Sequence, residues 1–215
     1  MLGELTLTCR IRCAEFSDLP QLVELEKVWP EDERASAEVL EHRIQKFQKG
    51  FLVIEDDSDL FASIISIPYY YDPNDLSNFK NWQHVVQKCY QPNSISHFTN
   101  ALYLVSATHK PSNYGNQPFT KGLTYMINLA KSMELEYVIA GCILPGYAKY
   151  ISKRGMISAT DYVFKSLRGK LADPLLEKYR HLNFIVPDKN HVLADYYPHA
   201  ASLNYAALVV HKIST

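Results

Sequence analysis

The pattern of hydrophobic and polar positions predicts an α/β chain that begins with a strand, two helices and a hairpin. Residues 5–13 alternate apolar and polar side chains at period two, which is typical of a strand. Residues 16–30 and 35–47 carry apolar side chains at helical spacing and predict two helices, with Val39 on the apolar face of the second. The stretches FLVIEDD and LFASIISIPYY then predict a hairpin with the polar turn DDSD.

The second half of the chain predicts alternating helices and strands. Residues 72–100 have turn-forming residues at both ends and a short helical pattern around Trp82, which indicates a long excursion containing one helix. The strand ALYLVSA, a helix over 119–133 and the strand YVIAGC follow. Asp173-Pro174 favours the start of a further helix, and NFIVP and YAALVVHKI predict two last strands. The predicted order is β-α-α-β-β-β-α-β-α-β-β.

Length, composition and charge favour one domain. With 215 residues and 47% hydrophobic content, the chain can bury one core, so we expect a single domain over 1–215 with a helical insert at about 143–172. The net charge of -1 and the pI near 6.7 argue against nucleic acid or a membrane as partner. No apolar run approaches the roughly 20 residues needed to cross a bilayer, and a signal-peptide core is lacking, so we expect a cytoplasmic protein.

The cysteines and tyrosines limit the chemistry. Cys9, Cys13, Cys89 and Cys142 lack C-x-x-C spacing, so we expect reduced thiols, no disulfide framework and no metal site. The 15 tyrosines suggest a partly wet cavity lined by their rings. The absence of a Ser-His-Asp or Cys-His constellation argues against a hydrolase.

The loop SNYGNQPFTKGL lies between a predicted strand and a predicted helix, where many α/β proteins bind a pyrophosphate. Lys121 adds a positive charge near the helix start, and Pro118 lacks an N–H to donate. The other groups that could hold a phosphate are two flanking glycines and three polar side chains: Gly115, Gly122, Asn116, Gln117 and Thr120. An ordinary strand-to-helix loop is the alternative, because proline is common in a first helical turn without any ligand.

The element order and the segment YRHLNF, residues 179–184, resemble the Gcn5-related N-acetyltransferase (GNAT) superfamily. Members commonly carry Y-x-x-x-G-F at this place, and Asn183, which replaces the glycine, is the next-best residue for a left-handed helix end. The resemblance implies that Tyr179 is the general acid toward the departing coenzyme A (CoA) thiolate. It also implies a mixed α/β sheet of about seven strands, splayed between strands 4 and 5, with helices on both faces.

The same resemblance implies how acyl-CoA binds. Amides from Val105 to Ala107 would align the pantetheine as an added strand, and the loop before the next helix would hold the pyrophosphate. The superfamily pattern there is Q/R-x-x-G-x-G/A, and its three signature positions fall on Gly115, Pro118 and Thr120, none of which matches. Binding of acetyl-CoA or malonyl-CoA is therefore expected to be weaker than in members with the full pattern.

Four segments, VWPEDERASAEVLEHRI, GCILPGYAKYIS, DPLLEKYRHLNF and NYAALVVHK, resemble GNAT-like domains of polyketide synthase loading modules more narrowly. This implies an acyltransferase that passes a short acyl group to an amine or to an acyl carrier protein thiol. Trp29, Cys142 and Tyr147 would then line the acyl pocket. Trp29 as a core aromatic and Cys142 as a buried structural thiol are the alternatives.

Two features leave the activity open. Family decarboxylases use a histidine and a threonine beside the malonyl carboxylate, but no histidine lies between His109 and His181, so we expect no decarboxylase activity. His109 itself is either a base or an exposed histidine without a chemical role. The alternative function is a catalytically silent GNAT-like domain with a structural or docking role in a loading module. The basic residues of the insert, including Lys153 and Arg168, form either a solvated face or a landing site for an acidic carrier protein.

Overall fold

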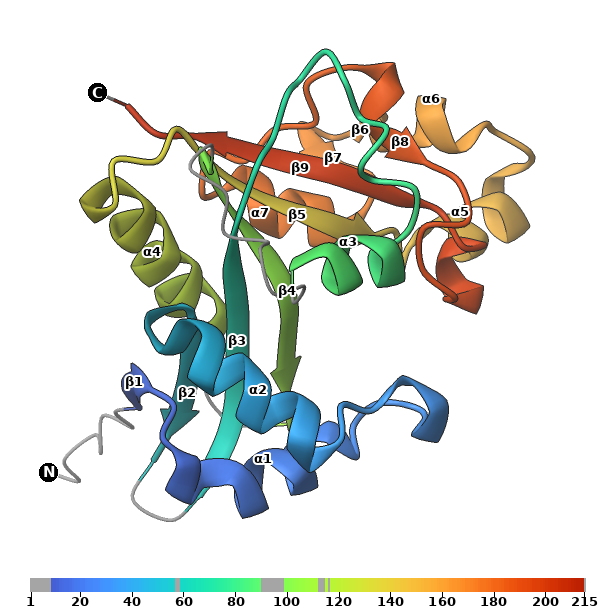
Figure 1. Cartoon of the computed structure of the whole chain (residues 1–215). Coiled ribbons are helices and arrows are strands. Elements are labelled where there is room, and N and C mark those ends of the chain that lie inside the picture. Colours follow the sequence, from blue (N-terminus) through green and yellow to red (C-terminus); the bar gives the residue numbers. More distant parts are fainter. Residues whose placement is uncertain (1–8, 57–58, 90–98, 112–114, 116, 215) are drawn as a thin grey trace, which may run out of the picture. The chain divides into compact units, whose positions relative to one another are not determined.

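The computed structural model of the chain describes residues 9–56, 59–89, 99–111, 115 and 117–214 (Figure 1). Within them, seven strands form one sheet in the order β1-β2-β3-β4-β5-β9-β8, with β4 and β5 parallel and the other neighbours antiparallel. These strands are β1 (Arg10–Cys13), β2 (Phe51–Glu55), β3 (Leu60–Tyr69), β4 (Ala101–His109), β5 (Tyr137–Ile143), β8 (Val192–Leu193) and β9 (Ala206–Lys212). The predicted mixed sheet of about seven strands is confirmed.

The helices occupy most of the predicted places. They are α1 (Leu19–Glu26), α2 (Ala37–Phe47), α3 (Trp82–Cys89), α4 (Gln117–Ser132), α5 (Tyr147–Arg154), α6 (Ala159–Val163) and α7 (Pro174–Arg180). Among the described residues, no helix has the length and apolar character that a membrane crossing needs. The chain divides into two compact units, one of residues 1–67 and 104–129 and the other of residues 68–103 and 130–215. The single domain stays a prediction.

In the first unit, helices cover both faces of the strands. Successive strand residues point to opposite faces, and in β1 the Cys13 thiol lies 3.5 Å from the Tyr125 hydroxyl of α4. Arg12, on the opposite face, binds Asp18 at the start of α1. The two helices therefore lie on opposite sides of β1.

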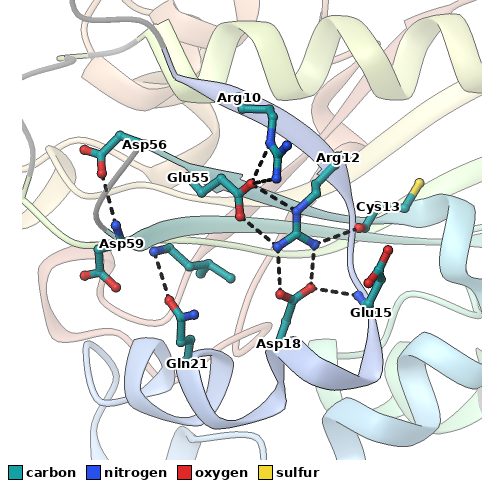
Figure 2. A network of polar contacts seen from close by, with 10 residues as sticks. Arg10, Arg12, Cys13, Glu15, Asp18, Gln21, Glu55, Asp56 and Asp59 are labelled. Carbon is teal, nitrogen blue, oxygen red and sulfur yellow. Dashed lines mark hydrogen bonds and ion pairs between the residues drawn. The ribbon is translucent and has the colours of Figure 1, made fainter.

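An ion network joins β1, β2 and the start of α1 (Figure 2). The Arg12 guanidinium donates two hydrogen bonds of 2.7 Å to the Asp18 carboxylate, and it also donates to Glu55 of β2. Arg10 binds the same Glu55 carboxylate. Hydrogen bonding to Arg12 is the largest cause that lowers the pKa of both Asp18 and Glu55. The network therefore fixes the N-terminal strand to its neighbour and to the first helix.

In the second unit, Asp173 joins the helices of the insert. Its carboxylate accepts hydrogen bonds from the backbone N–H groups of Leu175 and Leu176, as expected for the cap of α7. It also accepts from the Gly146 N–H, next to α5, and from the Tyr162 hydroxyl of α6. Burial is the main cause that raises the pKa of Asp173, and these four donors oppose that effect.

Four of the 15 tyrosines lie in the core of the second unit, so these four do not line a wet cavity. Tyr71, Tyr103, Tyr162 and Tyr196 are at most 1% exposed, and each hydroxyl has a protein partner. Tyr71 is bonded to His191 at 2.9 Å, and the Tyr103 and Tyr196 hydroxyls are 2.7 Å apart. These phenols fill the core of the second unit because its other polar groups satisfy their hydroxyls.

Two local expectations were wrong, and one small hairpin was not predicted. NFIVP forms only an isolated bridge, Ile185 to Val210, and the short strand β8 pairs with β9 instead. Val39 is 41% exposed, and Arg43 takes a buried place on α2. The insert also contains a small hairpin of β6 (Ser166–Leu167) and β7 (Lys170–Leu171), with Arg168 and Gly169 at positive φ in its turn. That turn follows from the left-handed conformation that glycine allows.

Candidate functional site

The end of β4 carries the first part of the candidate site, in the first unit. Val105 is buried, Ala107 is half-buried, and β4 continues two residues beyond the predicted strand to His109. The Trp29 indole N–H donates a 2.9 Å hydrogen bond to the Thr108 hydroxyl, which fixes the indole against the strand. Trp29 is half-buried, so it fits neither a fully buried core residue nor a free surface residue. Its role in the acyl pocket stays a prediction.

The start of α4 carries the polar groups expected to meet a pyrophosphate. Gly115 has the positive φ of 58°, and Gln117 is the first residue of the helix. The side chains of Gln117, Thr120 and Lys121 are exposed. A helix N-terminus offers free backbone N–H groups and a partial positive charge, and Lys121 adds a full one. Asn116, also expected here, lies outside the described residues.

Pro118 and Gly122 face the protein interior. Pro118 is buried and supplies no N–H, which leaves the first turn of α4 with fewer donors than a typical helix start. A Cβ at Gly122 would collide with Ile64 Cδ1 of β3, so the glycine allows α4 to approach the sheet closely. This packing explains Gly122 without a ligand, and its contact with a phosphate stays a prediction.

Tyr179 lies in the second unit, on a helix that is fixed at both ends. Asp173 caps the start of α7, and Asn183 follows its end with a φ of 59°. The Asn183 N–H donates to the Arg180 carbonyl, and the Phe184 N–H donates to the Tyr179 carbonyl at 3.2 Å. These two bonds form a Schellman motif, so the expected left-handed helix end at Asn183 is confirmed.

Burial determines the electrostatics around Tyr179. The side chain is 7% exposed, and burial raises the pKa of its phenol far above the ordinary value, with a smaller contribution from the nearby Cys142 thiol. Cys142, near the end of β5, is itself buried, and burial raises the pKa of its thiol. A thiol in such surroundings is a poor nucleophile, which favours the structural alternative for Cys142. The phenol, in contrast, stays protonated at neutral pH because its pKa is raised.

Tyr147 packs within the insert, where both its hydroxyl and its ring have partners. Its hydroxyl donates a 2.8 Å hydrogen bond to the Ile157 carbonyl, beyond the end of α5. Its ring lies 4.9 Å from the ring of Tyr162 and is edge-on to Tyr205. A place in the acyl pocket stays a prediction for this residue.

Sequence reasoning missed Ser106 of β4. Its hydroxyl oxygen is buried and has no hydrogen-bond partner among the residues that the structure describes. Buried polar atoms are nearly always paired, so this exception requires an explanation. No signal in the sequence distinguishes this serine from others in strands. His109, by comparison, is exposed.

The described residues contain no group of three or more His, Cys, Asp or Glu side chains that could hold an ion.

Comparison with solved structures identifies the class of fold. The chain is similar to the loading GNATL domain of CurA from Lyngbya majuscula (20% identity over 96% of this chain and 98% of that chain, TM-score 0.78). It is also similar to the GphF GNAT-like decarboxylase in complex with isobutyryl-CoA (20% identity, 95% and 100% covered, TM-score 0.74). A third likeness is to yncA from Salmonella typhimurium with its cofactor acetyl-CoA (12% identity, 96% and 94% covered, TM-score 0.58).

These likenesses, together with the strand order, show that the chain has the fold of the Gcn5-related N-acetyltransferases. The predicted GNAT resemblance is thereby confirmed at the level of the fold. No family model matches the sequence, and a search of curated proteins finds no match.

Proposed function

We propose that this chain is an acyltransferase that takes acetyl or another short acyl group from CoA. The observation that carries the proposal is the position of Tyr179, a buried and protonated phenol beside Cys142 near the end of β5, on a helix fixed at both ends. The GNAT resemblance implies a proton donor for the leaving thiolate at this position. Likeness to GphF in complex with isobutyryl-CoA and to yncA with acetyl-CoA supports an acyl-CoA as the ligand.

In this proposal, the first unit binds the CoA moiety. Backbone groups from Val105 to Ala107 pair with the pantetheine as an added strand. The start of α4 binds the pyrophosphate, with Lys121 supplying charge and the Gln117 and Thr120 side chains supplying hydrogen bonds. Acetyl-CoA or malonyl-CoA then enters as a substrate, and no metal takes part.

The reaction is transfer through a tetrahedral intermediate. The acceptor attacks the thioester carbonyl carbon, and the intermediate collapses by breaking the C–S bond, which leaves the acyl group on the acceptor and CoA as thiolate. The Tyr179 pKa lies above the roughly 8.5 of a free thiol, so complete proton transfer from phenol to sulfur is uphill. Tyr179 therefore stabilises the thiolate by donating a hydrogen bond, and the proton released by the acceptor completes the thiol.

The acceptor is either an amine or the phosphopantetheine thiol of an acyl carrier protein. Residues 143–172 contain six Lys or Arg side chains and one Asp, in a chain whose net charge is -1. All six are exposed, and among the described residues none of them forms an ion pair: Lys149, Lys153, Arg154, Lys165, Arg168 and Lys170. This charge favours an acidic carrier protein as partner. Decarboxylation is not part of the proposal, because the segment between His109 and His181 lacks a histidine.

The second candidate is a catalytically silent domain with a structural or docking role in a polyketide synthase loading module. Pro118 favours it, because a buried proline in the first turn of α4 removes a donor that a phosphate would use. The likeness to the CurA loading domain is compatible with either function.

A transfer assay distinguishes the two candidates. The chain is incubated with acetyl-CoA and either a primary amine or a carrier protein bearing phosphopantetheine, and mass spectrometry measures the acceptor. The acyltransferase proposal predicts one added acetyl group on one acceptor. Binding of acetyl-CoA without transfer to either acceptor supports the silent domain, and lack of binding contradicts the acyltransferase proposal.

A further inference from the structure

Ser106 occupies the middle of the β4 segment that the proposed function assigns to pantetheine. Its hydroxyl oxygen is buried, and within the described residues no group forms a hydrogen bond with it. A buried hydroxyl without a partner lowers the stability of the folded state, because it has lost its bonds to water. A ligand that supplied the missing partner would recover that free energy on binding.

Side-chain alternation puts Ser106 on the face of β4 that carries the Trp29 contact. Residues two apart in a strand point to the same face, so Ser106 and Thr108 share one. The Thr108 hydroxyl accepts the Trp29 indole N–H. The unpaired hydroxyl therefore lies on the same side of the strand as the aromatic ring expected to wall the acyl group.

Ser66, on the neighbouring strand β3 of the same unit, is a buried serine whose hydroxyl does have hydrogen-bond partners. Ser66 is 1% exposed, and its hydroxyl lies 3.3 Å from the Gly50 carbonyl and 3.2 Å from the Met126 sulfur. The first unit thus supplies hydrogen-bond partners for the Ser66 hydroxyl but none, among its described residues, for the Ser106 hydroxyl.

We propose that the Ser106 hydroxyl binds substrate by donating a hydrogen bond to a carbonyl oxygen of the acyl-pantetheine. This inference rests on the proposed function. Directly opposite residues on neighbouring strands have their Cβ atoms about 4.5–5.5 Å apart, so side chains of β4 interact with groups that project from the same face of an added strand. Acyl-pantetheine offers two kinds of carbonyl acceptor, the thioester and the amides, and a serine O–H matches both.

Ser106→Ala tests the proposal by two readouts with different expected directions. The dissociation constant for acetyl-CoA, measured by calorimetric titration, rises about tenfold, as expected for one lost hydrogen bond. The thermal midpoint of the unliganded chain stays the same or rises, because the substitution removes an unsatisfied polar atom. Free CoA has the pantetheine amides but no thioester. If the thioester is the acceptor, Ser106→Ala leaves the affinity for free CoA unchanged. If an amide is the acceptor, Ser106→Ala weakens the binding of free CoA and of acetyl-CoA by the same factor.

Two further variants serve as controls. Ser106→Thr keeps the hydroxyl and retains most of the affinity. Ser66→Ala removes a paired hydroxyl, so it lowers the thermal midpoint and leaves the affinity for acetyl-CoA unchanged.

The proposal is overturned if Ser106→Ala binds acetyl-CoA as tightly as the unaltered chain. It is also overturned if this variant is less stable or fails to fold, because the hydroxyl would then support the fold itself. If the unaltered chain does not bind acetyl-CoA at all, the proposed function fails first, and that result is separate from either outcome for Ser106.

Discussion

The Phe184 N–H donates to the Tyr179 carbonyl at 3.2 Å, and the two rings lie edge to face with centroids 5.1 Å apart. Both contacts depend on the chain reversing direction at Asn183, whose φ is 59°. The backbone turn and the aromatic contact together fix the position of the phenol beside Cys142. The geometry of the proposed hydrogen-bond donor to the thiolate therefore depends on one left-handed residue.

Asn183→Val is expected to lower the free energy of unfolding by about 1–2 kcal/mol, because a β-branched residue is strained at positive φ. Asn183→Gly, which has no such strain, is expected to be neutral or slightly stabilising. Urea unfolding measures both. Asn128→Val, at an exposed position within α4, is the control and should change stability by less than about 0.5 kcal/mol, because the two residues have similar helix propensities. Equal losses at positions 183 and 128 would contradict the role of the turn.

Tyr179→Phe is expected to slow acyl transfer at least about tenfold while the affinity for acetyl-CoA stays nearly the same, because only the leaving thiolate loses its hydrogen bond. Steady-state kinetics and titration measure the two effects. Tyr71→Phe removes an equally buried phenol of the same unit, bonded to His191, and should leave the transfer rate unchanged. Equal rates for Tyr179→Phe and the unaltered chain would remove Tyr179 from the mechanism.

Arg12→Met is expected to lower the free energy of unfolding at pH 7 by about 2 kcal/mol, because it leaves the nearly buried Asp18 carboxylate without its cation. The Asp18 and Glu55 pKa values are lowered in the folded chain, so their contribution is present above the unfolded value of about 4 and is lost as the pH falls through the folded values. The difference between variant and unaltered chain should therefore shrink below about pH 4.

Denaturant unfolding across pH measures this difference. Lys27→Met, which removes an exposed pair with Glu24, is the control and should change stability by less than about 0.5 kcal/mol. A loss for Arg12→Met that is the same at pH 3 and pH 7 would contradict the electrostatic account.

The sequence predicted the features that depend on adjacent residues. Asp173-Pro174 begins α7, and Asn183 follows its end, because caps and left-handed turns are determined by the residues that form them. Ser106 and the Trp29–Thr108 bond were not foreseen, since that bond joins residues 79 apart, and an unpaired hydroxyl is defined only by what surrounds it.

Strand pairing shows the same limit. Ile185 lies in a stretch with strand-like composition, but the chain gives it a single bridge, whereas the short strand at Val192 completes the sheet beside β9. Local composition does not determine which strand of the sheet a given segment will pair with. Gly122 gives a second example, because a position expected beside a phosphate is explained by close packing on Ile64.

Thermal unfolding with and without acetyl-CoA tests the central claim, that this GNAT fold still binds an acyl-CoA, most directly. A ligand that binds only the folded state must stabilise it, by about 2.7 kcal/mol at a hundredfold excess over its dissociation constant. The account predicts a midpoint that rises with acetyl-CoA concentration. A midpoint that stays constant up to millimolar acetyl-CoA would contradict it.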